Sequence, residues 1–390
     1  MLFEKAFGIL VMLGILSVLI IVHECGHFLV ARFFGFQTPV FGLGLPFGPS
    51  ISLGKRWNTE FRIHAAFLGG YVAIPELGDE TNAAEDVFGI KLKPFKKFPI
   101  WQRALVAVAG VTFNVIFAYL LMLGLFYGLG KPTPQVQVSS LVAENPIAKN
   151  AGVLPQDQIK GVDDISIDRS QKLITYLGQH ASQPVTLKVL RNGQMIQIPI
   201  TQNAQGKVGM ALGEKEEFRP VEGNPLQVAI QAGEELGIRT NAMLAGLGDM
   251  VTNIATAPIR ALNRDDKSQA NKPGLGDLHG VLAVVKVGGD MVSRDWTSLI
   301  MTTIMISMDL AVINLLPWPA LDGGHLAFMT LEKLRGKPME ERAQGELVKW
   351  GFLSLLALMV VVMVNDVVAI ATGKLDLPRK QDAINKNPDK

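Results

Sequence analysis

The stretch AFGILVMLGILSVLIIVHECGHFLV, residues 6–30, decides the fold of this chain. Its apolar part, Ala6 to Val22, carries no charge and is preceded by Lys5, as the core of a signal peptide would be. No cleavage site of small residues follows, because the run continues directly into His-Glu-Cys-Gly-His. We therefore expect a retained transmembrane helix from Ala6 to Val30 that carries polar groups near its end.

Three further stretches are long and apolar enough to cross a bilayer, which takes about 20 helical residues. They are Ala104–Leu129, Trp296–Leu321 and Trp350–Ile370. The composition agrees, because charged residues make up 18% of the chain against about 25% in an average soluble protein. The predicted fold class is a polytopic α-helical membrane protein with four transmembrane helices.

The charge distribution predicts the orientation of the spans. Basic residues are concentrated in the loop 32–103 and in the loop between the third and fourth spans, so both loops are expected in the cytoplasm. The N-terminus, the segment 130–295 and the C-terminus are then external. The formal net charge of +2 gives no reason to expect nucleic acid as a partner. The single cysteine, Cys25, excludes an intrachain disulfide.

The spans and the polar stretches between them divide the chain into five parts. The parts are residues 1–130, with spans one and two; 131–205, a small domain; 206–295, with an amphipathic helix over Pro225–Val251 on the outer surface and a polar linker over Asn263–Asp277; 296–373, with spans three and four; and 374–390, a tail that we expect to be disordered.

Residues 131–205 show the pattern of an inserted α+β domain. Strands are expected at 136–142, 158–162, 185–191 and 195–201, and helices at 147–151 and 171–179. The last two strands flank Asn192-Gly193, which is a strong hairpin signal. A domain of this size is large enough to fold independently.

The first cytoplasmic loop contains a second region of β pattern. Phe41–Leu53 is rich in glycine, proline and aromatics, and Glu60–Ile74 mixes β-forming residues with Gly69-Gly70, which indicates a turn. This pattern predicts a small membrane-associated β-hairpin. An ordinary structured loop explains the same residues equally well.

The sequence His23-Glu24-Cys25-Gly26-His27 is an H-E-x-x-H motif. On a helix, residues four apart share a face, so both imidazoles can bind one Zn²⁺ while Glu24 contacts the bound water as general base. The alternative is a polar helix end that reaches into the membrane interface, which explains one such residue but not two histidines at ligand spacing. Cys25 lies on another side of the helix and is expected to be a small buried residue.

A catalytic zinc usually has three protein ligands, so a third must come from elsewhere. Asp322 is the candidate, because it ends the third span at the depth expected for the two histidines. Pro317 and Pro319 break the helix before it and leave an extended segment against which a substrate strand could lie. The alternative for Asp322 is a helix cap. His325 is not expected to be a ligand, and Asp309, deeper in the same span, is either buried and protonated or paired.

The H-E-x-x-H motif in span one, with N-x-x-P-x-P-x-L-D-G at Asn314–Gly323, resembles the site-2 protease family of intramembrane metalloproteases. The G-x-x-x-N pattern at Gly110–Asn114 matches as well. The order of span, span, external domain, span and span is similar to the bacterial regulator-of-sigma-E protease group, and residues 145–157 look like the entry to its PDZ domain. Gln156 departs from the PDZ pattern, which has glycine there.

The resemblance implies roles for individual residues. His23, His27 and Asp322 would bind zinc, and Glu24 would be the catalytic base. Substrate-binding roles fall to Asn314, for the substrate backbone or the oxyanion; Pro317 and Pro319, in the extended segment; Asn114, which would help the substrate helix to unwind; and Gly69, Gly70 and Tyr71, in the β-hairpin that pairs with substrate.

The expected function is hydrolysis of single-span membrane proteins that another protease has already cut. Examples are the release of an anti-sigma factor's cytoplasmic part and the clearance of signal-peptide remnants, in the bacterial inner membrane with the PDZ-like domain on the periplasmic side. Two alternatives belong to other classes. A peptide-binding scaffold would not need an intact Glu24, and a metal transporter would need further polar residues along the spans.

Overall fold

The computed structural model describes residues 2–44, 48–65, 69–74, 98–142, 145–262, 280–292 and 296–372. The chain divides into two compact units. One contains residues 1–122 with 233–375, and the other contains residues 123–232. The predicted linker at Asn263–Asp277 and the predicted tail lie outside the described residues.

In the described part of the chain, four helices are long and apolar enough to cross a membrane, as predicted. They are α1 (Leu2–Phe34), α3 (Ile100–Gly128), α8 (Trp296–Leu315) and α10 (Glu341–Ala371). The third ends at Leu315 and not at the predicted Leu321, because the prolines that follow lack the N–H that would continue the helix. The chain then restarts as α9 (Asp322–Arg335).

Two more helices follow the α+β domain. The predicted amphipathic helix begins at Pro225 as expected and extends to Leu262 as α6. A short apolar helix, α7 (Val281–Val292), was not predicted because it is too short to span a bilayer. It packs against α1, α8 and α10, and a Cβ at Gly8 of α1 would come within 2.2 Å of the carbonyl oxygen of Gly289. This helix is therefore part of the helical unit.

The described residues of the loop between α1 and α3 form a four-stranded sheet, so the prediction of a single hairpin was wrong. Its strands, in the order β2-β3-β1-β4, are β1 (Val40–Leu43), β2 (Ser50–Arg56), β3 (Thr59–His64) and β4 (Gly70–Val72). The tight turn is at Trp57-Asn58, where both φ angles are positive (54° and 58°), and not at Gly69-Gly70. Strands β3 and β4 lie on opposite sides of β1. The pairing of β1 with β3 is parallel, and its pairing with β4 is antiparallel.

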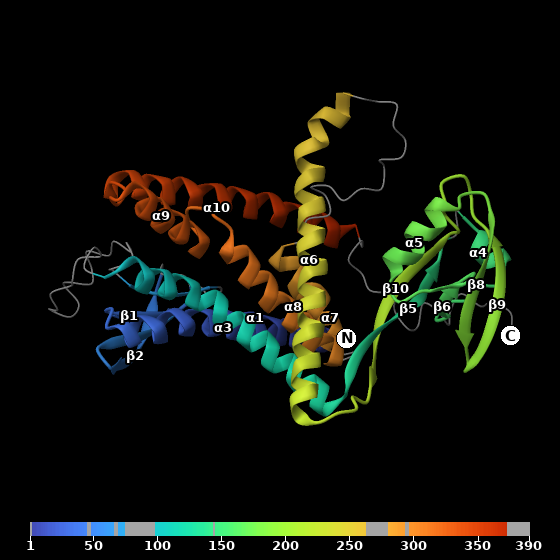
Figure 1. Cartoon of the computed structure of the whole chain (residues 1–390), viewed down its shortest axis with the longest axis horizontal. Helices are drawn as coiled ribbons and strands as arrows, with labels where there is room; N and C mark the ends of the chain where they lie inside the picture. The colour runs from blue at the N-terminus through green and yellow to red at the C-terminus, as the bar shows by residue number, and fades with distance from the viewer. Residues whose placement is uncertain are drawn as a thin grey trace. The chain divides into compact units, whose positions relative to one another are not determined.

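The second unit is a sheet with two helices beside it (Figure 1). The strand order is β10-β5-β6-β8-β9, with β7 paired to β6. The elements are β5 (Lys131–Leu141), α4 (Ile147–Asn150), β6 (Gln158–Val162), β7 (Ile165–Ser166), α5 (Ser170–Gln179), β8 (Pro184–Arg191), β9 (Gln194–Thr201) and β10 (Met210–Arg219).

Most elements of this unit agree with the sequence pattern. Asn192 and Gly193 have φ angles of 50° and 80°, which is the geometry that the hairpin signal requires. Strand β10 lies beyond the predicted boundary at residue 205, yet it pairs with the whole length of β5. A buried cluster of aliphatic side chains from the strands and both helices forms the core, including Val138, Leu173 and Leu187.

Candidate metal centre

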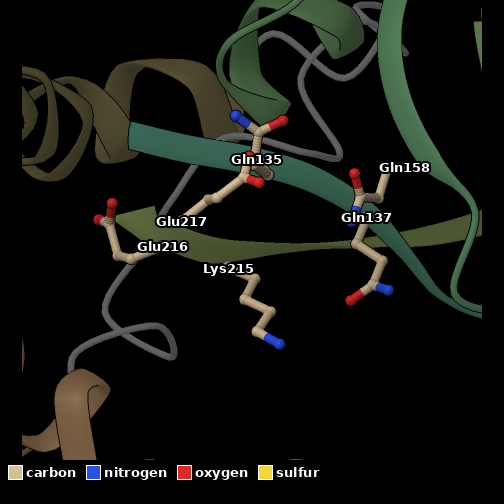
Figure 2. A pocket seen from close by; sticks show the side chains of 6 residues that line it. All are labelled: Gln135, Gln137, Gln158, Lys215, Glu216 and Glu217. Atoms are coloured by element: carbon tan, nitrogen blue, oxygen red, sulfur yellow. The ribbon is translucent and has the colours of Figure 1, made fainter. Parts of the chain in front are cut away.

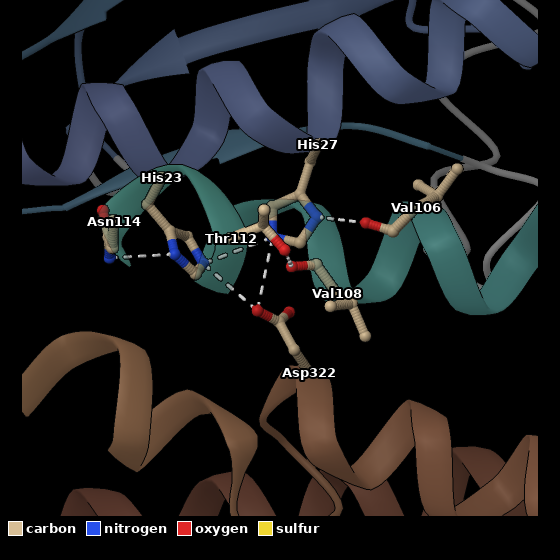
Figure 3. A network of polar contacts seen from close by, with 7 residues as sticks. All are labelled: His23, His27, Val106, Val108, Thr112, Asn114 and Asp322. Atoms are coloured by element: carbon tan, nitrogen blue, oxygen red, sulfur yellow. Dashed lines mark hydrogen bonds and ion pairs between the residues drawn. The ribbon is translucent and has the colours of Figure 1, made fainter. Parts of the chain in front are cut away.

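The two histidines of the H-E-x-x-H motif lie on one face of α1 and point toward α3 and α9 (Figure 3). Their Nε2 atoms are 3.2 Å apart. Both side chains are largely buried, with 12% and 10% of their surface exposed. The helical spacing of His23 and His27 therefore brings two nitrogen ligands together, as the motif predicts.

Asp322 completes a group of three side chains, among the described residues, that could hold a metal ion. It is the first residue of α9, where the chain resumes helical structure after the proline break. Its Oδ2 lies 3.2 Å from Nε2 of His23 and 3.3 Å from Nε2 of His27. Thus two segments that are remote in the sequence meet at one point.

The three atoms have the spacing of one face of a zinc coordination tetrahedron. Ligands at about 2.0–2.1 Å from Zn²⁺ lie about 3.3–3.4 Å from one another in a regular tetrahedron. The observed edges are 3.2, 3.2 and 3.3 Å. In addition, Oδ2 of Asp322 is buried and has no hydrogen-bond partner, although it faces two nitrogens. The group fits a zinc ion with one position left open.

The ionisation of the carboxyl group agrees with this fit. Burial alone would raise the pKa of Asp322. The adjacent imidazoles of His23 and His27 outweigh burial and hold the pKa of Asp322 below its usual range. The candidate third ligand is therefore a carboxylate at neutral pH.

The contact of His27 with α3 fixes which of its nitrogens is free. Nδ1 of His27 lies 2.8 Å from the carbonyl oxygen of Val106. A carbonyl only accepts hydrogen bonds, so Nδ1 carries the proton and donates it. In the neutral imidazole the lone pair is then on Nε2, the nitrogen on the side of Asp322, as a metal ligand requires.

Helix α3 approaches the motif closely because it has small residues at the crossing. A Cβ at Gly26 would come within 2.4 Å of the carbonyl oxygen of Ala109. A Cβ at Gly110 would come within 2.4 Å of Nε2 of His27 and 2.7 Å of Nε2 of His23. Gly110 therefore forms the wall of the centre on the α3 side, which its place in the G-x-x-x-N pattern did not by itself indicate.

An ion pair joins α3 to α9. Both terminal nitrogens of Arg103 donate to the carboxylate of Glu332, at 3.0 and 2.7 Å. The side chain of Arg103 is 3% exposed and that of Glu332 is 16% exposed. This pair ties the helix that begins with Asp322 to the helix that supports His27. Sequence reasoning missed it, because Arg103 was counted only as a charge at the end of a span.

The remaining predicted residues take different positions. Glu24 lies beside β4, since a Cβ at Gly70 would come within 3.2 Å of its Cγ. The Tyr71 ring lies over Gly42 of β1, and its hydroxyl is 3.2 Å from Nε2 of His64. Gly69 has a φ of 114° and precedes the strand.

The proline segment leaves much of its surface accessible. Pro317 is exposed, whereas Asn314 and Pro319 are partly buried. The indole Nε1 of Trp318 donates to the carbonyl oxygen of Gly351, at 3.1 Å, and so ties this segment to α10.

Three other candidates of the sequence stand outside the group of ligands. His325 and Asp309 are partly buried, and the His325 ring lies edge-on to Phe328. Cys25 is also only partly buried, not fully as expected.

The second unit carries a polar pocket of another kind (Figure 2). It lies over strands β5, β6 and β10 and is lined by Gln135, Gln137, Gln158, Lys215, Glu216 and Glu217. These are amide and charged side chains without a histidine or cysteine. The pocket lacks the ligand set of the helical unit.

Comparisons with known proteins agree with the geometry. The model of peptidase family M50 matches residues 11–358. The chain is 33% identical over 379 residues to "Putative zinc metalloprotease all3971" of Nostoc sp., which covers 94% of this chain and 97% of the relative. It is 28% identical over 375 residues to "Putative zinc metalloprotease Atu1380" of Agrobacterium fabrum, covering 90% and 93%. It is 28% identical over 368 residues to "Probable membrane metalloprotease ARASP2, chloroplastic" of Arabidopsis thaliana, covering 90% and 78%.

The family resemblance expected from the motifs is thereby confirmed. The match extends over both motif-bearing segments, since it includes residues 23–27 and residues 314–323. The chain belongs to peptidase family M50, the site-2 protease family, and is a zinc metalloprotease.

Proposed function

We propose that the protein hydrolyses peptide bonds within the membrane-spanning segments of single-span membrane proteins. In this proposal His23, His27 and Asp322 hold one Zn²⁺, and Glu24 is the general base. The observation that carries it is the triangle of ligand atoms with edges of 3.2, 3.2 and 3.3 Å.

The chemistry follows from these ligands and one carboxylate. A zinc ion held there would lower the pKa of a water molecule to about 7 and polarise the scissile carbonyl. Glu24 takes the proton of the attacking water as the new C–O bond forms. It then delivers a proton to the amide nitrogen as the C–N bond breaks. Glu24 is next to His23 on α1, which supports this role.

Strand β4 is the proposed docking edge for the substrate. A helical substrate must unwind before its peptide bonds become accessible, and the freed backbone then needs hydrogen-bonding partners. Strand β4 is at one end of its sheet, and Gly70 at its start approaches the side chain of Glu24. An extended substrate strand that pairs with β4 is held next to the base, with Pro317, Pro319 and Asn314 as further contacts.

We assign a PDZ-like, substrate-filtering role to the second unit. Its strand β10 is an edge strand, and α5 lies beside it, since the backbone N–H of Ser170 donates to Oε1 of Glu214 at 2.7 Å. A strand edge next to a helix is where an extended peptide can add to a sheet. Gln156 has a φ of 74°, a conformation favoured by glycine, which is the residue of the PDZ pattern there.

The proposed location is the bacterial inner membrane, with the PDZ-like unit on the periplasmic side. The basic residues of the loop 32–103 support this orientation. The bacterial origin of similar relatives supports the choice of membrane. Substrates would arrive after another protease has removed most of their external domain.

The test is cleavage of a tagged single-span protein, trimmed outside the membrane, in liposomes with the purified enzyme. Glu24→Gln should abolish cleavage and keep the zinc content near that of the unmodified protein, and His23→Ala should lose both. Glu346→Gln is the matched control, because this glutamate is 56% exposed on α10. Undiminished cleavage by Glu24→Gln would refute the proposal.

A further inference from the structure

The side-chain amide of Asn114 lies against Nδ1 of His23. Asn114 is 0% exposed, and its Nδ2 is 3.3 Å from Nδ1 of His23 (Figure 3). The other end of the amide, Oδ1, is buried and has no hydrogen-bond partner. A buried acceptor without a donor is costly, by about 1–3 kcal/mol in typical cases. The orientation with Nδ2 against His23 therefore leaves one end of the amide unsatisfied.

The orientation of the amide decides which nitrogen of His23 carries the proton. An amide nitrogen only donates hydrogen bonds. If Nδ2 of Asn114 faces Nδ1 of a neutral His23, that Nδ1 must accept, and the proton of the ring is then on Nε2. That proton occupies the nitrogen that faces Asp322. A rotation of 180° about the last side-chain bond exchanges Nδ2 and Oδ1 in the same volume.

With the amide rotated, the roles are reversed. Oδ1 of Asn114 accepts the proton of Nδ1, and the lone pair of Nε2 is free to bind a metal. His27 is already held in this way, by the carbonyl oxygen of Val106 at 2.8 Å. Both imidazoles would then donate from Nδ1 to an oxygen of the same helix, α3, at positions two turns apart.

We infer that Asn114 is a positioning residue for the metal centre, and that it holds His23 in the metal-binding tautomer through Oδ1. The inference rests on the proposed zinc site. Asn114 has no exposed surface with which to contact a substrate. Its backbone is also fixed, because Oγ of Ser307 on α8 donates to its carbonyl oxygen at 2.8 Å.

The test compares zinc affinities of purified full-length variants, measured by competition with a chromophoric chelator. Asn114→Leu removes the acceptor at similar size and should weaken zinc binding about 10–100-fold, the usual loss when a partner of a ligand histidine is removed. Asn114→Asp keeps an acceptor and should bind zinc within about threefold of the unmodified protein or more tightly. Thr112→Val is the matched control, because the Thr112 hydroxyl donates within its own helix, to the carbonyl oxygen of Val108.

A second readout separates positioning from general damage. Cobalt(II) in place of zinc should give the same visible spectrum in Asn114→Asp as in the unmodified protein, and a changed spectrum in Asn114→Leu. Wild-type zinc affinity in Asn114→Leu would overturn the inference. A loss of zinc affinity in Asn114→Asp as large as that in Asn114→Leu would overturn it too. The Asn114→Asp measurement does not depend on whether Asn114→Leu folds. Zinc binding by His23→Ala would instead overturn the proposed centre itself.

Discussion

Gly110 of α3 and His27 of α1 are in such close contact that a Cβ at position 110 would come within 2.4 Å of Nε2 of the histidine. Real Cβ atoms essentially never come so near another heavy atom. Nε2 of His27, a candidate ligand atom, is therefore bounded on one side by the hydrogens of a glycine. The packing of two helices and the shape of the metal centre depend on the same residue.

Replacing this glycine should disturb the centre directly. In Gly110→Ala the new methyl group meets both imidazoles, so α3 or the histidines must move, and we expect zinc affinity to fall about tenfold or more. Chelator competition on the purified protein measures the loss. Gly124→Ala, on the same helix, is the control, because a Cβ there meets nothing within 4 Å. Equal zinc affinity in the two variants would contradict the close packing.

The Arg103–Glu332 pair predicts a link between stability and metal binding. Glu332→Gln leaves a nearly buried guanidinium without its bidentate partner. The expected loss is about 2 kcal/mol in the free energy of unfolding. Breaking a fully buried pair costs about 3–5 kcal/mol, and the loss here is smaller because Glu332 is partly exposed. Zinc affinity should fall as well, since Asp322 is on the same helix as Glu332. Thermal unfolding in detergent and chelator competition test both parts.

The control for this pair is an exposed charged pair on α10. Glu346 and Lys349 of α10 are both more than half exposed, so Glu346→Gln should change neither quantity. A loss of stability in Glu332→Gln without any loss of zinc affinity would show that α9 keeps Asp322 in place by other contacts.

Residue spacing was enough to predict the parts of the centre that are local in sequence. His23 and His27 meet because residues four apart share a helix face, and Asn192-Gly193 turns because both residues tolerate a positive φ. The approach of Asp322 to the two histidines was also predictable, since the two prolines before it end the third span. The structure brings all three ligand atoms within 4.8 Å of one another.

Contacts between distant segments could not be read from the sequence. The pairing of β1 with β3 in parallel leaves no local signal, so a four-stranded sheet was taken for a hairpin. The carbonyl of Val106 is a backbone group, which any residue would supply. The partner of Arg103 is on α9, in a part of the chain whose distance in space the sequence does not fix.

The contact of Gly70 with Glu24 predicts a variant that loses activity but keeps its metal. In Gly70→Ala the methyl group meets the side chains of Ile20 and Glu24, at 2.9 and 3.2 Å. Displacing the base should lower the cleavage rate about tenfold or more, within the range that general bases contribute. Zinc content should stay unchanged, because the three atoms nearest the new methyl group belong to Ile20, Glu24 and Gly42 and not to a proposed ligand. Gly14→Ala on α1 is the control, because a Cβ at Gly14 meets nothing within 4 Å.

Chelation should abolish the activity reversibly without unfolding the second unit. A strong chelator removes the ion from the proposed centre, so cleavage should cease and return when zinc is added in excess. The sheet of residues 131–219 contains none of the proposed ligands, and its thermal unfolding should stay unchanged. Cleavage that persists after zinc has been removed to background, by metal analysis, would contradict a catalytic role of the ion.

The Asp157–Arg191 pair predicts the converse, a variant that damages the second unit and spares the metal. Asp157 is 2% exposed and accepts from Nε and Nη2 of Arg191, both at 2.7 Å, and from the backbone N–H of Leu154 at 2.8 Å. The hydrogen bond with this carboxylate raises the pKa of Arg191, so the guanidinium stays charged. Asp157→Ala leaves the arginine without its partner and the Leu154 N–H without an acceptor. We expect a loss of about 2–4 kcal/mol in this unit.

Zinc affinity in Asp157→Ala should equal that of the unmodified protein, because the pair and the proposed ligands belong to different units. Asp168→Ala is the control, since its side chain is 66% exposed in a surface pair with Lys172 and its removal should change little. If the PDZ-like unit filters substrates, Asp157→Ala should also cleave single-span proteins that retain their external domains, which the unmodified enzyme should reject. Rejection of those substrates by a variant whose second unit is shown to be unfolded would remove the filtering role from that unit.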